Sequence, residues 1–353
     1  MYNLDASISK FLREHKLTSI PLGKLPADLL SELLDQVSIQ DPRVILGPGI
    51  GIDCAVIDQG PTLLVLKTDP ITFATDQIGW YLVQINANDI ATTGALPRWM
   101  MVTALLPGEG TTRKMVKEIS AQIQNACQST GITLIGGHTE ITHSLDRPIL
   151  VGTMIGEVDK DSLVTPRGAS PGDRILLTKG IPIEATAILA REFPLRLSQD
   201  VSSKELEQAK NYLFDPGISV LKEAQTAVKS GKVTAMHDPT EGGLATALWE
   251  LAEASSRSLL IDPSSVPISP LSKKVCDAFG LDPFGAIASG ALLLTCQAQD
   301  AQNIRTAIID EGIACAEIGE VGDGPASVMA WHESKYTRLA RPERDEVSKA
   351  FLE

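Results

Sequence analysis

The amino-acid sequence predicts a two-domain α/β protein, of the mixed type also called α+β. Its 353 residues are more than a single hydrophobic core usually serves, so two domains are expected. Strand-like and helix-like patterns alternate on both sides of residues 166–172, a segment rich in Pro and Gly. We therefore expect one domain over residues 1–165 and a second over residues 166–353.

In the first half, apolar runs between Gly and Pro turns indicate strands, and apolar residues at helical spacing indicate helices. The segment 111–130 has the clearest helical period, with Met115, Ile119 and Ile123 on one face. The expected helices are 26–36, 78–93 and 111–130, and the expected strands are 43–46, 54–58, 62–68, 99–106, 132–135 and 148–158.

The same two patterns continue beyond residue 172, with helices more frequent than in the first half. The expected strands are 174–177, 232–236, 258–261, 291–295 and 315–321, and the expected helices are 183–191, 204–213, 218–229, 243–254, 271–278 and 301–310.

Composition and charge narrow the classes of partner. The formal net charge is −13, so the chain offers no overall basic surface for nucleic acid. No apolar run approaches the roughly 20 residues of a membrane span, and residues 1–5 lack the basic start of a signal peptide. The five cysteines form no CxxC pair, which is typical of buried, reduced thiols. We expect a cytoplasmic protein that binds neither nucleic acid nor membrane.

Two aspartates lie where the chain enters or leaves an expected strand. Asp53 follows Gly49 and Gly51, which allow a left-handed backbone and the close approach of a phosphate. Asp69 ends an apolar strand, and Pro70 is expected to end the ladder and leave Asp69 at the rim of the sheet. Ordinary hairpin and turn roles explain either aspartate alone.

A third aspartate, Asp89, lies in the expected helix 78–93, one turn after Ile85 and therefore on or beside the apolar stripe. An isolated buried carboxylate is costly, so a partner or a cation is expected. Together, Asp53, Asp69 and Asp89 have no equally prominent basic partner. This pattern favours Mg²⁺, which binds a few carboxylates plus substrate phosphates and neutralises charge in phosphoryl transfer.

A glycine pair follows the expected strand 132–135 and opens the sequence Gly136-Gly137-His138-Thr139-Glu140. Backbone amides at such a pair could cradle a phosphate. A zinc site formed with His143 is the weaker interpretation, because the order His-x-Glu-x-x-His is not the helical spacing of metalloproteases.

The segment 237–243, with the sequence HDPTEGG, precedes the expected helix 243–254. Asp238 or Thr240 would cap that helix, and the amides of its first turn would attract an anion. An ordinary capped helix explains the segment equally well. The glycine patterns of dinucleotide-binding folds and of P-loop enzymes are absent, so neither class is indicated.

Taken in order, five motifs resemble the AIR synthase superfamily, and in particular its HypE-like members. They are GIDCAV at 51–56, TD at 68–69, NDIATTGALP at 88–97, GGHT at 136–139 and DPTEGGL at 238–244. The resemblance spans about residues 20–335. It implies an N-terminal domain that binds ATP and magnesium and pairs with a second subunit in a homodimeric, barrel-like core. It also implies a C-terminal α/β domain that closes over the site.

The resemblance further implies roles for single residues. Asp53, Asp69 and Asp89 would hold Mg²⁺ against the phosphates of ATP, and Lys24 would contact those phosphates, so these four are the expected catalytic residues. The residues expected around the cofactor are Gly49, Gly51, Lys67, Asn88, Gly136, Gly137, His138 and Thr139. Those expected around the substrate are Asp238, Thr240, Glu241, Gly242 and Gly243.

The activity that the resemblance implies is Mg-ATP-dependent phosphoryl transfer to a small-molecule acceptor, either an amide or carbonyl oxygen or a phosphate. Two alternatives are a hydrogenase-maturation accessory that acts on a partner and a non-catalytic nucleotide-binding scaffold. HypE itself acts on a cysteine at its own C-terminal end, whereas the last cysteine here is Cys315. His138 stands where many members carry Asp or Glu, and Glu140 is the candidate replacement.

Overall fold

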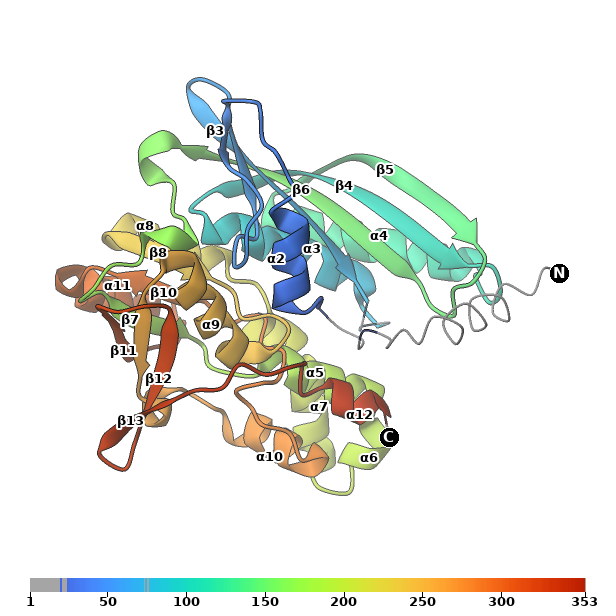
Figure 1. The fold of residues 1–353 in the computed structure, drawn as a ribbon. Coiled ribbons are helices and arrows are strands. Elements are labelled where there is room, and N and C mark those ends of the chain that lie inside the picture. Colours follow the sequence, from blue (N-terminus) through green and yellow to red (C-terminus); the bar gives the residue numbers. More distant parts are fainter. Residues whose placement is uncertain (1–19, 21–23, 73, 75, 353) are drawn as a thin grey trace, which may run out of the picture.

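Two α/β domains lie side by side in the computed structural model, which describes residues 20, 24–72, 74 and 76–352 (Figure 1). The first domain is built on a six-stranded sheet and the second on a seven-stranded sheet. The prediction of a two-domain α/β fold is therefore confirmed, while the boundary between residues 165 and 166 stays a prediction. The expectation for residues 1–5 concerns residues outside the described ones.

The first sheet has the order β1-β2-β3-β6-β4-β5 and is open within one chain. Its described strands pair antiparallel except β4 and β5, which are parallel and are connected by α4. The barrel-like core expected of two subunits is thus not formed by this sheet alone. The strands are β1 Val44–Leu46, β2 Ala55–Asp58, β3 Thr62–Ile71, β4 Leu96–Pro107, β5 Thr133–Thr142 and β6 Ile149–Asp159, and the helices are α2 Ala27–Leu34, α3 Ile78–Thr92 and α4 Arg113–Thr130.

Helix α3 covers one face of this sheet and contacts β3, β6 and β4, and α4 packs beside it. α3 packs close to the sheet because β6 has glycines where the helix crosses it. A Cβ on Gly152 would lie 2.6 Å from Asn86 Nδ2, and one on Gly156 would lie 2.4 Å from Ile90 Cγ2. As a result α3 is buried along almost its whole length, not only along one apolar stripe.

Two expectations about strand ends are wrong. β3 continues to Ile71, so Pro70 lies within the strand; it is tolerated because the neighbouring strand β2 pairs with β3 only as far as Leu66. β5 continues to Thr142, so Gly136 and Gly137 lie in a strand and not in a turn. A Cβ on Gly137 would lie 1.9 Å from the carbonyl oxygen of Val102, so this glycine serves the close pairing of β5 with β4.

The second sheet has the order β13-β12-β9-β11-β7-β10-β8. α9 packs its leucines on one face, and α8 and α11 pack on the other. The strands are β7 Arg174–Thr178, β8 Val233–His237, β9 Ser258–Ile261, β10 Leu293–Cys296, β11 Cys315–Gly322, β12 Ser327–His332 and β13 Lys335–Arg338. The helices are α5 Ile183–Glu192, α6 Pro194–Leu197, α7 Ser203–Asn211, α8 Leu221–Ser230, α9 Gly243–Ser255, α10 Pro270–Phe279, α11 Ala298–Asp310 and α12 Ser348–Leu352.

The two domains share a hydrophobic core. The apolar cluster of the first domain continues into α5, α7 and α10 of the second, and α12 joins it through Val347 and Ala350. This continuity fixes how the loops of both domains face one another, which determines the geometry of the site. Among the described helices, none is both long enough and apolar enough to cross a lipid bilayer.

Candidate functional site

Three aspartates converge on the ammonium group of Lys67. Asp53 precedes β2, Asp69 lies in β3 and Asp89 lies in α3. Lys67 Nζ is 3.9 Å from Asp53 Oδ1, 3.3 Å from Asp69 Oδ2 and 3.0 Å from Asp89 Oδ2. The structure therefore brings together the three aspartates that the sequence singled out. The expectation that they lack a prominent basic partner is wrong, because Lys67 stands among them.

The charges in this cluster depend on one another. Burial alone would lower the pKa of Lys67, but Asp89, Asp53 and Asp69 raise that pKa well above its usual value. Burial would raise the pKa of Asp53, but His237 and Lys67 hold it well below its usual range. Asp89 differs, because burial raises its pKa well above the usual value despite the opposing effect of Lys67.

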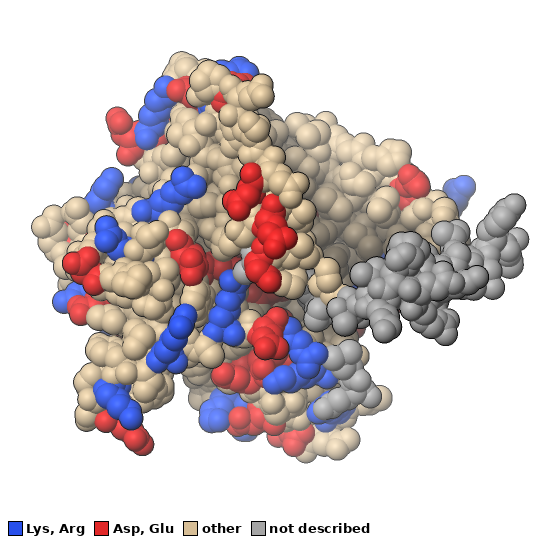
Figure 2. All heavy atoms as spheres, viewed as in Figure 1, with Lys and Arg blue, Asp and Glu red and all other residues tan. Residues whose placement is uncertain are grey.

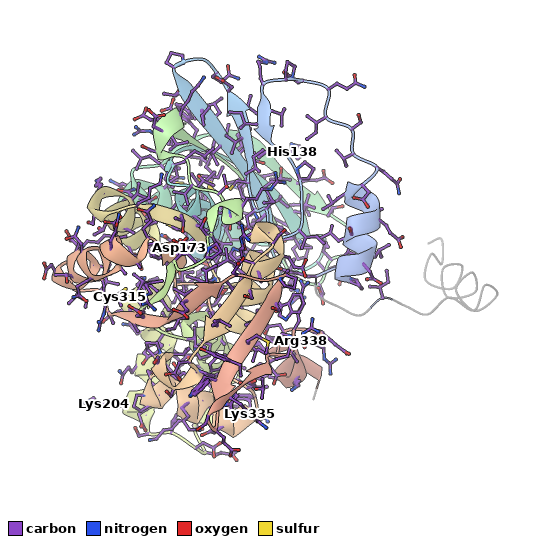
Figure 3. All side chains as sticks on the ribbon, turned by 60° about the vertical axis from the view of Figure 1, so that its left-hand side comes forward. His138, Asp173, Lys204, Cys315, Lys335 and Arg338 are labelled. Atoms are coloured by element: carbon purple, nitrogen blue, oxygen red, sulfur yellow. The ribbon has the colours of Figure 1, made fainter. Side chains whose placement is uncertain are left out.

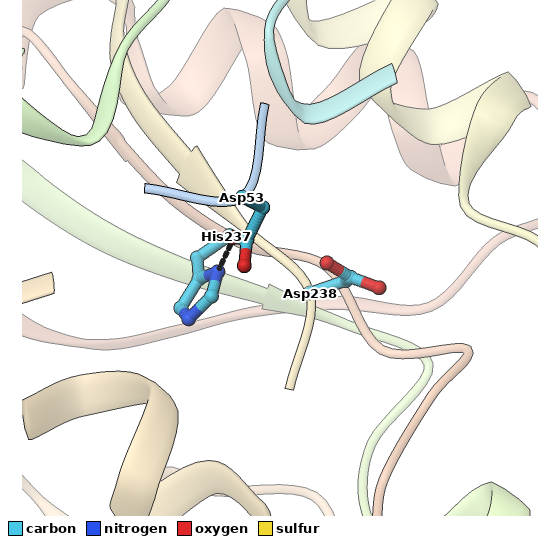
Figure 4. Close-up of side chains that lie close together, drawn as sticks. All are labelled: Asp53, His237 and Asp238. Carbon is cyan, nitrogen blue, oxygen red and sulfur yellow. Dashed lines mark ion pairs between the residues drawn. The ribbon is translucent and has the colours of Figure 1, made fainter. Parts of the chain in front are cut away.

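Asp238 belongs to the same cluster, beside Asp53 and at the end of β8 (Figure 4). Ligand atoms of Asp53, His237 and Asp238 all lie within 4.8 Å of one another. Both carboxylate oxygens of Asp238 are buried and make no hydrogen bond to the described residues, whereas Asp89 Oδ2 has the ion pair with Lys67 as its contact. Buried oxygens without donors suit a hard cation, so Asp238 fits a metal site better than the substrate role expected for it.

His237 lies between two carboxylates. Its Nδ1 is 3.0 Å from Asp53 Oδ2, and its Nε2 is 2.9 Å from Glu250 Oε2. Burial would lower the pKa of His237, but Asp53 and Glu250 raise it well above its usual value. In the metal-free protein both imidazole nitrogens face carboxylates, and a metal could bind the ring only by displacing a proton. We therefore assign His237 to holding Asp53 in place.

Glu250 was missed from the sequence, although a signal was present. It is a carboxylate inside the apolar helix α9, just as Asp89 is inside α3, and its residue exposure is 8%. Glu250 Oε1 also lies 3.4 Å from Lys24 Nζ and 3.4 Å from Arg341 Nη2. Glu250 thus links the predicted Lys24 to the histidine and aspartates of the cluster.

Lys24 lies at the edge of the cluster with its side chain 46% exposed. Burial acts to lower its pKa, but Glu250, Asp53 and Glu241 raise it. Lys24 is therefore a charged side chain that reaches solvent on one side and the carboxylates on the other, which is compatible with the predicted phosphate contact.

The two glycines before Asp53 lie against other residues of the chain. Gly51 has a left-handed backbone (φ 68°), and a Cβ there would lie 2.6 Å from the carbonyl oxygen of Glu250. Gly49 forms an isolated bridge with Ile52. The described contacts of Gly51 thus fasten the Asp53 loop to α9, and phosphate contact by Gly49 or Gly51 remains a prediction.

The two asparagines of α3 position neighbouring segments. Asn88 donates to the carbonyl oxygen of Ile218 (2.8 Å) and accepts from the amide of Val220 (2.9 Å). Asn86 accepts from the backbone amide of Asp69 (3.1 Å). Asn88 therefore ties the two domains together, and its predicted cofactor contact would require that tie to open.

The loop between β8 and α9 differs from the predicted helix start. The N-cap is Gly242, which has no side chain to cap with, so neither Asp238 nor Thr240 caps α9. Instead Asp345 accepts a hydrogen bond from the Gly242 amide at 2.6 Å. Gly243 is required because a Cβ there would lie 2.5 Å from the carbonyl oxygens of both Phe284 and Ala286. One of the amides expected to attract an anion is therefore already occupied.

Four of the residues expected around the cofactor lie on β5, apart from the carboxylates around Lys67. They are Gly136, Gly137, His138 and Thr139. In the strand register, Asp69 pairs with Gly152, Gly152 with Val102, and Val102 with Gly137, a separation of roughly 14 Å at the usual strand spacing. Helix α3 covers the face between them. These residues line a separate cavity of about 320 Å³ under α4, and His138 lies on the first sheet with an exposed side chain (Figure 3).

His138 and Glu140 form an exposed pair, with 3.5 Å between Nε2 and Oε2. Within one chain, neither side chain reaches the cluster around Lys67, because both lie on the far strand β5. The suggestion that Glu140 replaces an acidic ligand therefore has no support from the single chain.

A second cavity of about 500 Å³ opens beside the carboxylates, between the two domains. Lys24, Asp69, Thr240 and Glu241 line it on the side of the cluster. This volume is in the range of small-molecule sites. Thr240 and Glu241, which the sequence analysis placed around the substrate, thus border a cavity large enough for one.

Two family descriptions match the chain in succession. AIR synthase related protein, N-terminal domain, matches residues 51–158, and AIR synthase related protein, C-terminal domain, matches residues 170–332. The two matches together cover most of the chain and contain all the carboxylates of the cluster.

Individual relatives agree with these matches. The chain is 28% identical over 290 residues to a putative hydrogenase expression/formation protein of Methanocaldococcus jannaschii (78% of this chain, 81% of the relative). It is 29% identical over 271 residues to carbamoyl dehydratase HypE of Cupriavidus necator (73% of each chain). Its fold is similar to a crystal structure of hydrogenase maturation protein HypE in complex with ATP (TM-score 0.70, 24% identity, 90% of this chain and 96% of the other).

Proposed function

The chain belongs to the AIR synthase related protein family, and from this premise we propose that it is a Mg-ATP-dependent enzyme that phosphorylates a small-molecule acceptor. The acceptor atom would be an amide or carbonyl oxygen, or a phosphate oxygen. The fold of the ATP-bound HypE structure supports ATP as the donor.

One observation carries the proposal. Both buried carboxylate oxygens of Asp238 have no hydrogen-bond partner among the described residues, and the neighbouring carboxylates of Asp53 and Asp89 share the single ammonium group of Lys67. A folded protein can hold several buried carboxylates this close together when a bound cation or ligand neutralises their charge. A bound magnesium ion would neutralise phosphate charge during transfer.

The residues of the chain would divide the remaining tasks. Asp53, Asp89 and Asp238 supply oxygen ligands, while His237 and Lys67 hold Asp53 in position by ion pairs. Asp69 lines the cavity, so its carboxylate can reach the metal from the side where the acceptor would lie.

Lys24 has an independent role in the proposal. Its ammonium group is half-exposed at the edge of the same cavity, where it can contact the phosphates that are not bound to the metal. The chemistry then consists of positioning and charge stabilisation, which is the usual protein contribution to phosphoryl transfer.

We further propose a cytoplasmic homodimer. The face of the first sheet that lies opposite α3 has apolar, half-exposed side chains from three adjacent strands, including Leu66, Met101, Leu105, Val151 and Ile155. In the view of Figure 2, the surface over β4 and β6 has few charged side chains where the atoms are not grey. The five cysteines are buried free thiols, which agrees with a reducing compartment.

Hydrogenase maturation is the second candidate function, with a protein partner as the substrate. It is favoured by the name of the relative from Methanocaldococcus jannaschii and by the similar fold of hydrogenase maturation protein HypE. A non-catalytic nucleotide-binding scaffold is the third. These candidates differ in what happens after ATP binds, so they can be separated experimentally.

The first test is calorimetric titration of the full chain with ATP, with and without Mg²⁺, on the wild type and on Asp69→Asn. We expect binding that depends on Mg²⁺ and is weakened by the substitution. ADP release that depends on an added amide or phosphate-ester acceptor would support the enzyme, and ATP binding without turnover on any acceptor would favour a scaffold or a protein substrate. Absence of ATP binding in the wild type would overturn the proposal.

A further inference from the structure

The lining of the cavity of about 500 Å³ between the domains differs in exposure. Lys24 and Asp69, which belong to the carboxylate cluster, are partly exposed, with side-chain exposures of 46% and 35%. The buried part of the lining, which we call its enclosed end, has polar groups among apolar side chains, contributed by Ile71, Ala74, Ile85, Ile188 and Ile287. Arg147 also lines the cavity.

Three buried polar side chains line the enclosed end, and each comes from a different element. Tyr81 belongs to α3, Glu184 to α5 and Ser289 to the segment before β10. Their residue exposures are 1%, 5% and 0%. Tyr81 Oη, Glu184 Oε2 and Ser289 Oγ have no hydrogen-bond partner among the described residues.

Such a group of atoms is unusual in a protein interior. Buried polar atoms are nearly always paired, and each unpaired one costs about 1–3 kcal/mol. Ser289 is the neighbour of Glu184, and contacts from its hydroxyl and its backbone lower the pKa of the carboxyl against the larger effect of burial, yet Glu184 Oε2 and Ser289 Oγ each lack a well-formed hydrogen bond. Three unpaired groups that border one cavity indicate a ligand that supplies what they lack.

We infer that this cavity binds the phosphoryl acceptor, and that Glu184 and Ser289 hold a nitrogen-containing group of the acceptor that carries N–H donors. The inference rests on the proposed function, because it takes the molecule in the cavity to be the acceptor. Glu184 Oε2 accepts from the N–H group, and the hydroxyls of Ser289 and Tyr81 can either donate or accept. A carboxylate placed against Glu184 would be repelled, whereas Arg147 in the same lining would attract one.

The same cavity would hold the reacting part of the acceptor. With the nitrogen of the acceptor held at Glu184, Asp69 and Lys24 remain in the lining for the group that reacts. The apolar walls favour a short aliphatic or ring portion. Recognition of the acceptor and activation of ATP are thus assigned to different residues.

The test uses three small probes of one shape: isobutylammonium, isobutyramide and isobutyrate. Their binding to the full chain at pH 8 is measured by saturation-transfer NMR, on the wild type, Glu184→Ala, Glu184→Gln and Ser289→Ala. Glu253→Ala is the matched control, because Glu253 is an exposed residue of α9 outside the cavity lining. Mg-ATP binding is measured on the same proteins, so that failure of this inference is distinguished from failure of the proposed function.

We expect at least one N–H probe to bind the wild type, and any binding of isobutyrate, which Arg147 could hold, not to weaken in Glu184→Ala. Glu184→Ala and Ser289→Ala should weaken N–H probe binding about tenfold or more, the scale of a lost hydrogen bond to a charged group. If the natural group is a cation, Glu184→Gln loses isobutylammonium; if it is an amide, that variant keeps isobutyramide. No N–H probe binding, N–H probe binding unchanged in Glu184→Ala, or an equal loss of isobutyrate binding in that variant would each overturn the inference.

Discussion

His237 Nε2 lies 2.9 Å from Glu250 Oε2, and the other nitrogen of the same ring faces Asp53. From this relationship we propose that Glu250 is a positioning residue for the proposed metal site. Glu250→Gln replaces a charged acceptor with an amide of similar volume, so the imidazolium loses one of its two anionic partners. We expect the affinity for Mg²⁺ in the presence of ATP to fall by about 1.5–3 kcal/mol, as for a hydrogen bond between charged groups.

The measurement is calorimetric titration with Mg²⁺ at a fixed ATP concentration. Glu253→Gln on the same helix is the control, because residue 253 is exposed. NMR titration of the His237 ring should show a lower pKa in Glu250→Gln. An unchanged Mg²⁺ affinity together with an unchanged imidazole pKa would show that Glu250 does not act through His237.

A second prediction concerns Asp89. Burial raises the pKa of this carboxyl well above its usual value, so its ionised form is costly in the folded protein without a metal. Asp89→Asn should abolish Mg-ATP turnover, yet leave the metal-free protein at least as stable as the wild type at pH 8. Turnover assays and thermal unfolding test the two statements separately. Wild-type turnover would remove Asp89 from the metal site, and a lower melting temperature would show that its charge stabilises the fold.

A third prediction concerns Lys24, which has a half-exposed ammonium group at the edge of the cavity. Lys24→Ala should weaken ATP binding by about 1.5 kcal/mol, the lower end for a charge-assisted hydrogen bond, because solvent screens this side chain. Calorimetry with ATP measures the change, and Lys114→Ala on α4 is a control at an exposed lysine. An ATP affinity equal to that of the wild type would exclude Lys24 from the site.

The sequence predicted the aspartates as site residues because each stands beside residues that indicate a particular local structure. Asp53 follows two glycines, Asp69 precedes a proline, and Asp89 interrupts an apolar helix. The fold class followed from the alternation of strands and helices and from the motif order. These signals are local or sequential, so they could be read without knowing how distant segments meet.

The partners of the aspartates depend on tertiary contacts that no local pattern contains. Lys67 lies two residues from Asp69 on the same face of β3, but its contact with Asp89 requires α3 to cross the sheet. Glu250 and Asp345 join the site from positions far along the chain, through His237 and Gly242. Gly136 and Gly137 were expected to follow the end of a strand because glycine often marks strand ends, whereas close strand pairing also requires glycine.

A fourth prediction tests the proposed homodimer. Met101 is 39% exposed on the sheet face opposite α3. Met101→Glu places a charge on this apolar face and should shift the protein from dimer to monomer in light scattering coupled to size exclusion. Leu195→Glu is the matched control, because Leu195 is 85% exposed on α6, away from the sheet. A wild type that is monomeric at all concentrations would contradict the dimer, and an unchanged dimer in Met101→Glu would exclude this face as its interface.

The last prediction is a pH dependence of stability that arises from Glu184. Burial raises the pKa of its carboxyl to about 7, from an ordinary value of 4.5, and the nearby Asp345 and Asp238 act in the same direction while Ser289 opposes them. Below pH 4.5 the group is protonated in both folded and unfolded chains and costs nothing. Between pH 4.5 and 7 this carboxyl ionises in the unfolded chain but not yet in the folded protein, so the free energy of unfolding falls as the pH rises.

Glu184→Gln removes this titration, and it should stabilise the protein by about 2–4 kcal/mol at pH 8 and by much less at pH 5. Urea unfolding of both proteins at the two pH values measures the difference, with Glu253→Gln as the exposed control. A difference in unfolding free energy that is the same at pH 5 and pH 8 would mean that Glu184 is ionised over the whole range, and that its carboxylate has a partner in the folded protein.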